Sequence, residues 1–201
     1  MTAAAAAPAD DLRVRILEAV YECVARFGFA KTTMADVARA AGSSRATVYR
    51  LFPGGRDELF AAMVAWEMDR FFVRMAVAVG DAEDFAAVVE GALVYAHREI
   101  RLHAALQKVL ATEPDRLLRF MTREDARILD AVVAYLRPRL DVEAAAGRVR
   151  PGVDLDEATR FVATMGLSLM ATPGRFDLED PEVVHHLVRC ELLGGILLSV
   201  G

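Results

Sequence analysis

The sequence has little of what a secreted, metal-binding or membrane-spanning protein needs. Only two cysteines occur, Cys23 and Cys190, and they match neither a disulfide framework nor the close ligand spacing of a zinc site. Both lie in apolar helical patterns, so we expect two reduced, buried thiols. No run of about 18 apolar residues is present, so we predict no membrane-spanning helix and no membrane partner. We expect a cytoplasmic protein.

Sequence signatures of enzymes and cofactor sites are also missing. There is no Gly-x-Ser-x-Gly nucleophile turn, no glycine-rich phosphate loop before a helix and no zinc-ligand spacing. The histidines do not compensate, because His97 and His103 do not share a helical face and His185 and His186 are adjacent and diverge. We therefore predict no catalytic residue, no bound metal and no cofactor.

Alternating strand patterns are absent as well, and the chain is predicted to be all-α. Residues 1–10 are expected to form a disordered leader. An apolar stripe from Leu12 to Phe27 predicts a helix over about 11–27. The later helices are expected at about 57–79, 83–111, 115–121, 123–140, 154–171 and 181–199.

Between the first helix and residue 57, the pattern predicts two short helices joined by a tight turn. Thr33 and Asp36 have the spacing of a capping box, which predicts a helix that starts there and ends at Gly42. Glycine suits this turn because it adopts positive φ without steric cost. A second short helix follows and ends before Pro53. Such a pair is typical of a helix-turn-helix, in which the second helix enters the major groove of DNA.

The second short helix has an apolar inner face and lies in a basic segment. Val48 and Phe52 are four residues apart and are expected to pack inward. The segment from Arg26 to Arg56 holds six basic residues against Asp36 alone, a net charge of +5. The whole chain has a charge of −5, so the remainder has −10. Because phosphate repels an acidic protein at long range, this local positive charge indicates a nucleic-acid surface.

The stretch ILEAVYECVARFGFAKTTMADVARAAGSSRATVYRLFPGGRDELF, residues 16–60, resembles the tetracycline-repressor (TetR) family of bacterial transcriptional regulators. The resemblance implies an all-α homodimer. Its N-terminal three-helix DNA-binding domain would comprise residues 11–56, and its C-terminal helical domain, for ligand binding and dimerisation, residues 57–201. It also implies that DNA is released when a small-molecule effector binds.

The resemblance assigns the DNA contacts by position. Arginine can bond bidentately to guanine, and serine, threonine and tyrosine hydroxyls can donate to phosphates. The expected phosphate contacts are Thr33, Tyr49 and Arg56, the expected base contacts are Ser44, Arg45 and Arg50, and Thr47 is expected at either.

Beyond residue 80 the predictions rest on residue types. An apolar effector is favoured because methionines and phenylalanines outnumber buried-looking charges. The candidate effector contacts are Trp66, Tyr95, His103, Met121, Tyr135 and Met165, with ordinary core packing as the alternative for each. Small residues that interrupt apolar helical runs predict close helix approach in the dimer, with packing inside one subunit as the alternative. These residues are Gly166, Ala171, Gly194 and Gly195.

The sequence thus predicts a ligand-responsive repressor that binds a palindromic operator on double-stranded DNA as a homodimer. The alternative is a helical small-molecule carrier or partner-binding module that retains the fold without operator binding. The basic segment discriminates between them, because a carrier has no need for several basic side chains around one short helix.

Overall fold

The computed structural model describes the backbone of residues 8–171 and 176–198. Side chains are described for these ranges except 8–10, 116–125 and 171. Regular structure in the described ranges is helical, apart from an isolated antiparallel bridge between Val149 and Leu197. The all-α prediction is therefore confirmed. Residues 1–7 of the predicted leader lie outside the described residues, and residues 8–10 already belong to the first helix.

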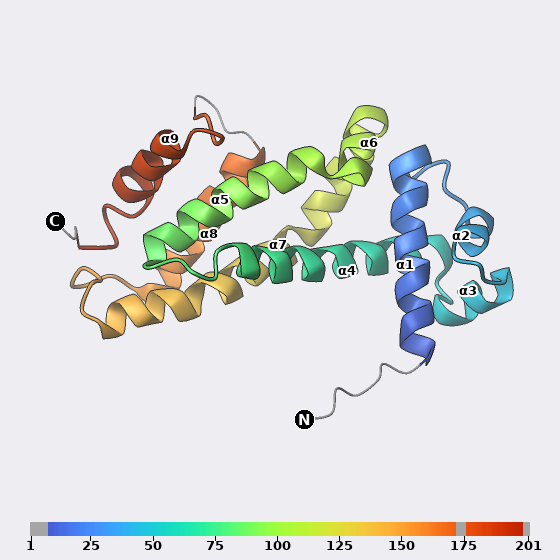
Figure 1. Ribbon diagram of the computed structural model, residues 1–201, viewed down its shortest axis with the longest axis horizontal. Coiled ribbons are helices and arrows are strands. Elements are labelled where there is room, and N and C mark those ends of the chain that lie inside the picture. The colour runs from blue at the N-terminus through green and yellow to red at the C-terminus, as the bar shows by residue number, and fades with distance from the viewer. Residues whose placement is uncertain (1–7, 172–175, 199–201) are drawn as a thin grey trace. The chain divides into compact units, whose positions relative to one another are not determined.

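The chain divides into two compact units. The first comprises residues 1–73 and 102–119, and the second comprises residues 74–101 and 120–201. The predicted functional boundary between residues 56 and 57 stays a prediction. Figure 1 labels α1 to α9, and the π-helix η1 follows α9. These are α1 (Pro8–Phe27), α2 (Met34–Ala40), α3 (Arg45–Leu51), α4 (Gly55–Ala78), α5 (Phe85–Leu102), α6 (Ala104–Thr112), α7 (Pro114–Ala145), α8 (Leu155–Ala171), α9 (Pro181–His186) and the π-helix η1 (Leu187–Leu192).

The first unit has a core of its own. Ile16, Val20 and Val24 of α1 are completely buried, which confirms the predicted stripe, whereas Phe27 at its end is 40% exposed. Two buried residues of α6, Ala105 and Val109, belong to the same apolar cluster as these α1 residues. Helix α6 is therefore part of the first unit's core, although about fifty residues separate it from α3.

Three predicted helix boundaries are wrong. The helix expected at 83–111 is broken at His103, because the His103 side chain caps α6 by accepting a hydrogen bond from the Leu106 N–H at 3.1 Å. The segments expected at 115–121 and 123–140 form one helix, α7, whose backbone continues through residue 122. The last predicted helix ends at Leu192 rather than near residue 199.

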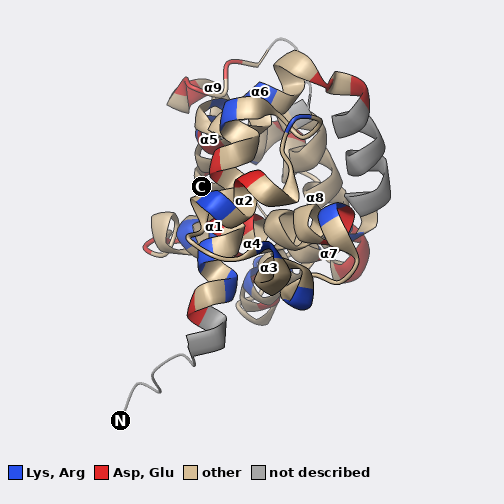
Figure 2. Cartoon of the chain, turned by 90° about the vertical axis from the view of Figure 1, so that its right-hand side faces the viewer, with Lys and Arg blue, Asp and Glu red and all other residues tan. Residues whose placement is uncertain are grey.

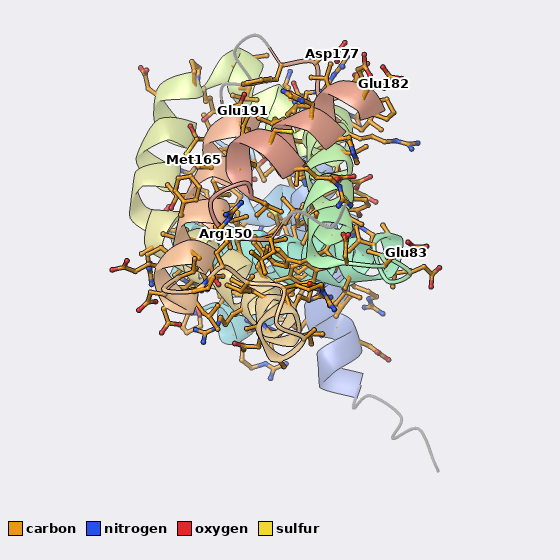
Figure 3. All side chains as sticks on the ribbon, turned by 90° about the vertical axis from the view of Figure 1, so that its left-hand side faces the viewer. Glu83, Arg150, Met165, Asp177, Glu182 and Glu191 are labelled. Carbon is orange, nitrogen blue, oxygen red and sulfur yellow. The ribbon has the colours of Figure 1, made fainter. Side chains whose placement is uncertain are left out.

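The last helix ends because a distant side chain binds the segment that follows it. The Arg150 Nε donates to the carbonyl oxygens of Gly194 and Leu197, both at 3.0 Å, and Figure 3 labels Arg150. Gly194 and Gly195 consequently lie in a turn. The expectation that they interrupt a helix interior is wrong, because a loop contact replaces the helical hydrogen bonds at this point.

The two cysteines differ in exposure. Cys23 is buried in the first unit, and burial raises the pKa of its thiol. Cys190 is exposed, so the expectation of a buried thiol is wrong at this position. Within the described residues, no helix has both the length and the apolar character to cross a membrane.

Candidate nucleic-acid interface

The start of α2 has the capping box that the sequence predicts. The Asp36 N–H donates to Thr33 Oγ1 at 3.2 Å, and the Asp36 carboxylate accepts from the Thr33 N–H at 3.3 Å and from the Thr33 hydroxyl at 2.5 Å. The hydroxyl's hydrogen bond holds the pKa of Asp36 below its usual range. The Thr33 hydroxyl is thus engaged inside the cap, and its contact with a phosphate stays a prediction.

The start of α3 is capped in a similar way. The Ser44 Oγ accepts from the Thr47 N–H at 3.1 Å and lies 2.9 Å from the Thr47 hydroxyl. The turn before it passes through Gly42 with φ of +60° and closes with a hydrogen bond from the Ser43 N–H to the Ala38 carbonyl at 2.9 Å. Ser44 and Thr47 therefore fix the start of α3, as N-caps do in other helices. Their contacts with DNA stay predictions.

The two faces of α3 differ as the sequence predicts. Val48 and Phe52 are completely buried. Arg45, Tyr49 and Arg50 are exposed, with Tyr49 at 50%. Figure 2 marks the Lys and Arg positions along the helices of this unit. The structure thus leaves two guanidinium groups and a phenol on the outer face of a helix whose inner face is held in the core.

Two glycines shape the connection from α3 to α4. Gly55 has φ of +72°, where a side chain would be strained, and its N–H donates to the Phe52 carbonyl at 3.0 Å. The Gly54 N–H donates to the Glu58 carboxylate at 2.6 Å, so Glu58 binds the turn that precedes its own helix. The glycine pair therefore closes the turn at the end of α3 and starts α4.

Arg56 lies against its own unit. Its Nη1 donates to the Ala30 carbonyl at 3.4 Å, and its guanidinium lies 5.8 Å from the centre of the Phe60 ring. The side chain is only partly exposed. A phosphate contact from Arg56 stays a prediction, and it would have to coexist with the hydrogen bond to the α1–α2 loop.

Arg13 is a basic residue that the charge count over residues 26–56 did not include. Its guanidinium lies 4.6 Å from the centre of the Phe52 ring, at the end of α3, and the residue is exposed. A charge count over one stretch of sequence omits such a residue, because Arg13 meets a ring that lies 39 positions later in the chain. Its position beside α3 makes Arg13 a further candidate for a phosphate contact.

The candidate effector contacts are divided between the two units. Trp66 and His103 lie in the first unit, whereas Tyr95, Tyr135 and Met165 lie in the second. The side chain of Met121 lies outside the described residues. The described effector candidates are therefore not all residues of one unit.

Each described candidate in the first unit has neighbours that explain its position. Trp66 packs against the first unit's core, and the Arg70 guanidinium lies 4.3 Å from the centre of its ring. His103 caps α6, its ring meets the Tyr21 ring edge to face at 5.2 Å, and its Nε2 lies 3.4 Å from the Glu67 carboxylate. Effector contacts from Trp66 and His103 stay predictions.

In the second unit, Tyr135 and Met165 are partly buried against the core, and Figure 3 labels Met165 on α8. The Arg139 guanidinium lies 3.9 Å from the centre of the Tyr135 ring, and burial raises the pKa of the Tyr135 hydroxyl. The Tyr95 hydroxyl accepts from the Arg74 Nε at 3.4 Å. These positions agree equally with core packing and with an effector contact.

The predicted dimer residues have different surroundings. A Cβ built on Gly166 of α8 would lie 3.8 Å from the Leu93 side chain, which is ordinary packing inside the second unit. The side chain of Ala171 lies outside the described residues.

Among the described residues, no cluster of three or more His, Cys, Asp or Glu side chains is arranged to hold a metal ion.

Comparison with known proteins gives the family. Residues 16–63 match the bacterial regulatory proteins of the tetR family. An HTH-type transcriptional regulator of Mycobacterium tuberculosis is 30% identical over 166 residues, which cover 83% of this chain and 82% of the relative.

Two solved structures have the same fold. The TetR family repressor AlkX of Dietzia has a TM-score of 0.63 at 21% identity, covering 93% of this chain and 94% of that one. SmeT of Stenotrophomonas maltophilia in complex with triclosan has a TM-score of 0.60 at 23% identity, covering 94% and 93%. The chain is a DNA-binding transcriptional regulator that belongs to the TetR family.

Proposed function

We propose that this regulator represses transcription by binding a palindromic operator as a homodimer, and that a small apolar effector releases it. On this proposal the chain catalyses no reaction, needs no cofactor and works in the cytoplasm, where its DNA is. Membership of a regulator family does not favour the alternative of a carrier or partner-binding module without operator binding.

The observation that carries operator binding is the outer face of α3. Arg45, Tyr49 and Arg50 are exposed there, while Val48 and Phe52 anchor the inner face. A helix held by its inner face can enter the major groove, where arginine distinguishes guanine by its two acceptor atoms. Two copies related by a two-fold axis would read two half-sites of a palindrome.

Selection from a random DNA pool at about 0.15 M salt should enrich a symmetric site with half-sites about 34 to 36 Å apart. Arg50→Ala should weaken binding to this site by about 1–3 kcal/mol and relax the preference at one base position in each half-site. The reason is that only a base contact carries sequence information. Binding constants measured on the selected site and its single-base variants check this result.

The control is Arg98→Ala, which removes the same charge from an exposed position on α5 in the second unit. It should leave the base preference unchanged. If no symmetric site is enriched, the operator proposal fails. If Arg50→Ala weakens binding to every sequence equally, Arg50 contacts phosphate instead of a base.

The effector proposal rests on the partly buried Tyr135 and Met165 in the second unit. Their aromatic and thioether surfaces suit an apolar molecule, and SmeT has been solved with triclosan.

For the dimer interface, Gly166 and Ala171 of α8 stay candidates. Gly194 and Gly195 stay candidates too, but their contacts with the second copy would come from a turn and not from a helix.

A screen for small molecules that release the operator should return apolar compounds, with triclosan as the first probe. Met165→Gln should raise the concentration needed for release about three- to tenfold, because an amide in an apolar site must be desolvated. Fluorescence anisotropy of labelled operator measures the release, and Trp66 emission reports whether the first unit responds. Release by polar compounds alone, with an unchanged response in Met165→Gln, would contradict the proposal.

A further inference from the structure

Both backbone groups of Ala30, in the loop between α1 and α2, are held by side chains from later helices. The Ala30 N–H donates to both carboxylate oxygens of Glu113, at 3.0 and 3.1 Å. The Ala30 carbonyl accepts from the Arg56 Nη1 at 3.4 Å. Glu113 is the C-cap residue of α6, and Arg56 is in the first turn of α4. One loop residue thus joins the end of α6 to the start of α4.

The loop and the end of α6 are in close contact. A Cβ built on Gly28 would lie 2.6 Å from Glu113 Oε1 and 3.3 Å from Thr112 Oγ1. No side chain fits at Gly28 without displacing the Glu113 carboxylate. The Glu113 carboxylate therefore lies against the loop at Gly28 as well as at the Ala30 N–H.

Helix α6 can hold this carboxylate in place because the rest of the helix is anchored. Ala105 and Val109 are buried in the first unit's core. At the other end of α6, His103 caps the helix and lies 3.4 Å from the Glu67 carboxylate of α4. A carboxylate on a helix fixed at its buried face and at its first turn is a rigid support.

The loop in turn determines where α2 starts. The buried Thr32 hydroxyl donates to the Gly28 carbonyl at 2.7 Å, which closes the loop on itself. Lys31 is exposed in the same loop, and Thr33 caps α2 directly after it. Because α2 and α3 are joined by a tight turn, displacement of the α2 start would displace the outer face of α3 as well.

We infer that Glu113 is a positioning residue for operator binding: its carboxylate holds the α1–α2 loop through the Ala30 N–H and thereby sets α2 and α3 for DNA. This inference rests on the proposed function, since it needs an operator. It assigns a role in DNA binding to a residue outside the helix-turn-helix.

Electrostatics make the sign of the effect informative. A carboxylate repels phosphate, so removing one from a DNA-binding protein should by charge alone strengthen its binding to any DNA. If Glu113 positions the loop, removal of its carboxylate should instead weaken binding to the operator. The two effects have opposite directions, so one measurement distinguishes them.

The experiment compares four full-length variants with the wild type, on the selected operator and on unrelated DNA. Glu113→Ala should weaken operator binding about tenfold, as expected for a lost hydrogen bond to a charged group, and bind unrelated DNA as tightly as the wild type or more tightly. Glu113→Gln should restore most of the loss, because the amide oxygen still accepts from the Ala30 N–H. Asp115→Ala, the same charge change at an exposed position two residues later, should not weaken operator binding.

Glu113→Asp keeps the charge but withdraws the carboxylate by one methylene, and it should also weaken operator binding. Thermal unfolding followed by circular dichroism shows whether Glu113→Ala folds. If that variant does not fold, the operator affinity of Glu113→Asp tests the inference in its place. Wild-type affinity of Glu113→Asp together with no loss in Glu113→Ala overturns the inference, as does equal weakening on operator and unrelated DNA. A wild type that selects no operator is a failure of the proposed function instead.

Discussion

Phe52→Ala should lower the free energy of unfolding of the first unit by about 3–5 kcal/mol and should abolish operator binding at concentrations where the wild type is saturated. Phe52 is completely buried, and its N–H donates to the Val48 carbonyl at 2.9 Å to end α3. The Arg13 guanidinium covers the ring at 4.6 Å. Truncation would leave a cavity beneath the end of α3 and remove the surface on which Arg13 lies.

Denaturant unfolding followed by the emission of Trp66 measures this effect, because Trp66 packs against the same core. The matched control is Phe27→Ala, since Phe27 is 40% exposed at the end of α1. This control should change the free energy of unfolding by less than about 1 kcal/mol. Equal effects of the two substitutions would mean that Phe52 does not anchor α3.

Phe85→Ala should lower the free energy of unfolding of the second unit by about 3–5 kcal/mol. Phe85 is 1% exposed at the start of α5. Its N–H donates at 3.1 Å to the buried carboxylate of Glu143, which also accepts from the Arg148 Nε at 2.5 Å. These hydrogen bonds hold the backbone of residue 85, so the start of α5 cannot move inward to fill the cavity that the substitution leaves. The loss in free energy of unfolding should therefore be about 5 kcal/mol.

The test is denaturant unfolding followed by circular dichroism, with Phe85→Leu as the graded control. Leucine fills most of the site and should cost less than about 1.5 kcal/mol. If Phe85→Ala is as stable as Phe85→Leu, the start of α5 must move inward and fill the cavity. That result would contradict the argument that Glu143 holds the backbone of residue 85 in place.

Local sequence determined the helix-turn-helix to nearly residue accuracy. The Thr33 and Asp36 capping box, the turn at Gly42 and the inward faces of Val48 and Phe52 are all found in the structure. Each of these features depends on residues within four positions of each other, so the residue types and their spacing are enough. The basic segment likewise follows from a count of side chains.

Contacts between distant residues decided the features that the sequence did not show. The turn at Gly194 follows from Arg150, which lies 44 residues before the glycine. The break at His103 is an exception, because its cap is local: it joins His103 to Leu106, three residues later, and the sequence analysis missed it. The sequence did not assign the effector candidates to one site. An apolar residue on a helix gives the same sequence pattern whether its side chain packs in a core or lines a cavity.

The sequence by itself determined that this chain is all-α, that its N-terminal part is a helix-turn-helix and that α3 presents arginines and a tyrosine outward. Only the tertiary structure decided that α6 belongs to the DNA-binding unit and that Glu113 holds the loop at Ala30. The physical reason is the range of the interactions. Capping and helical periodicity act over a few residues, whereas the bond from Ala30 to Glu113 joins positions 83 residues apart.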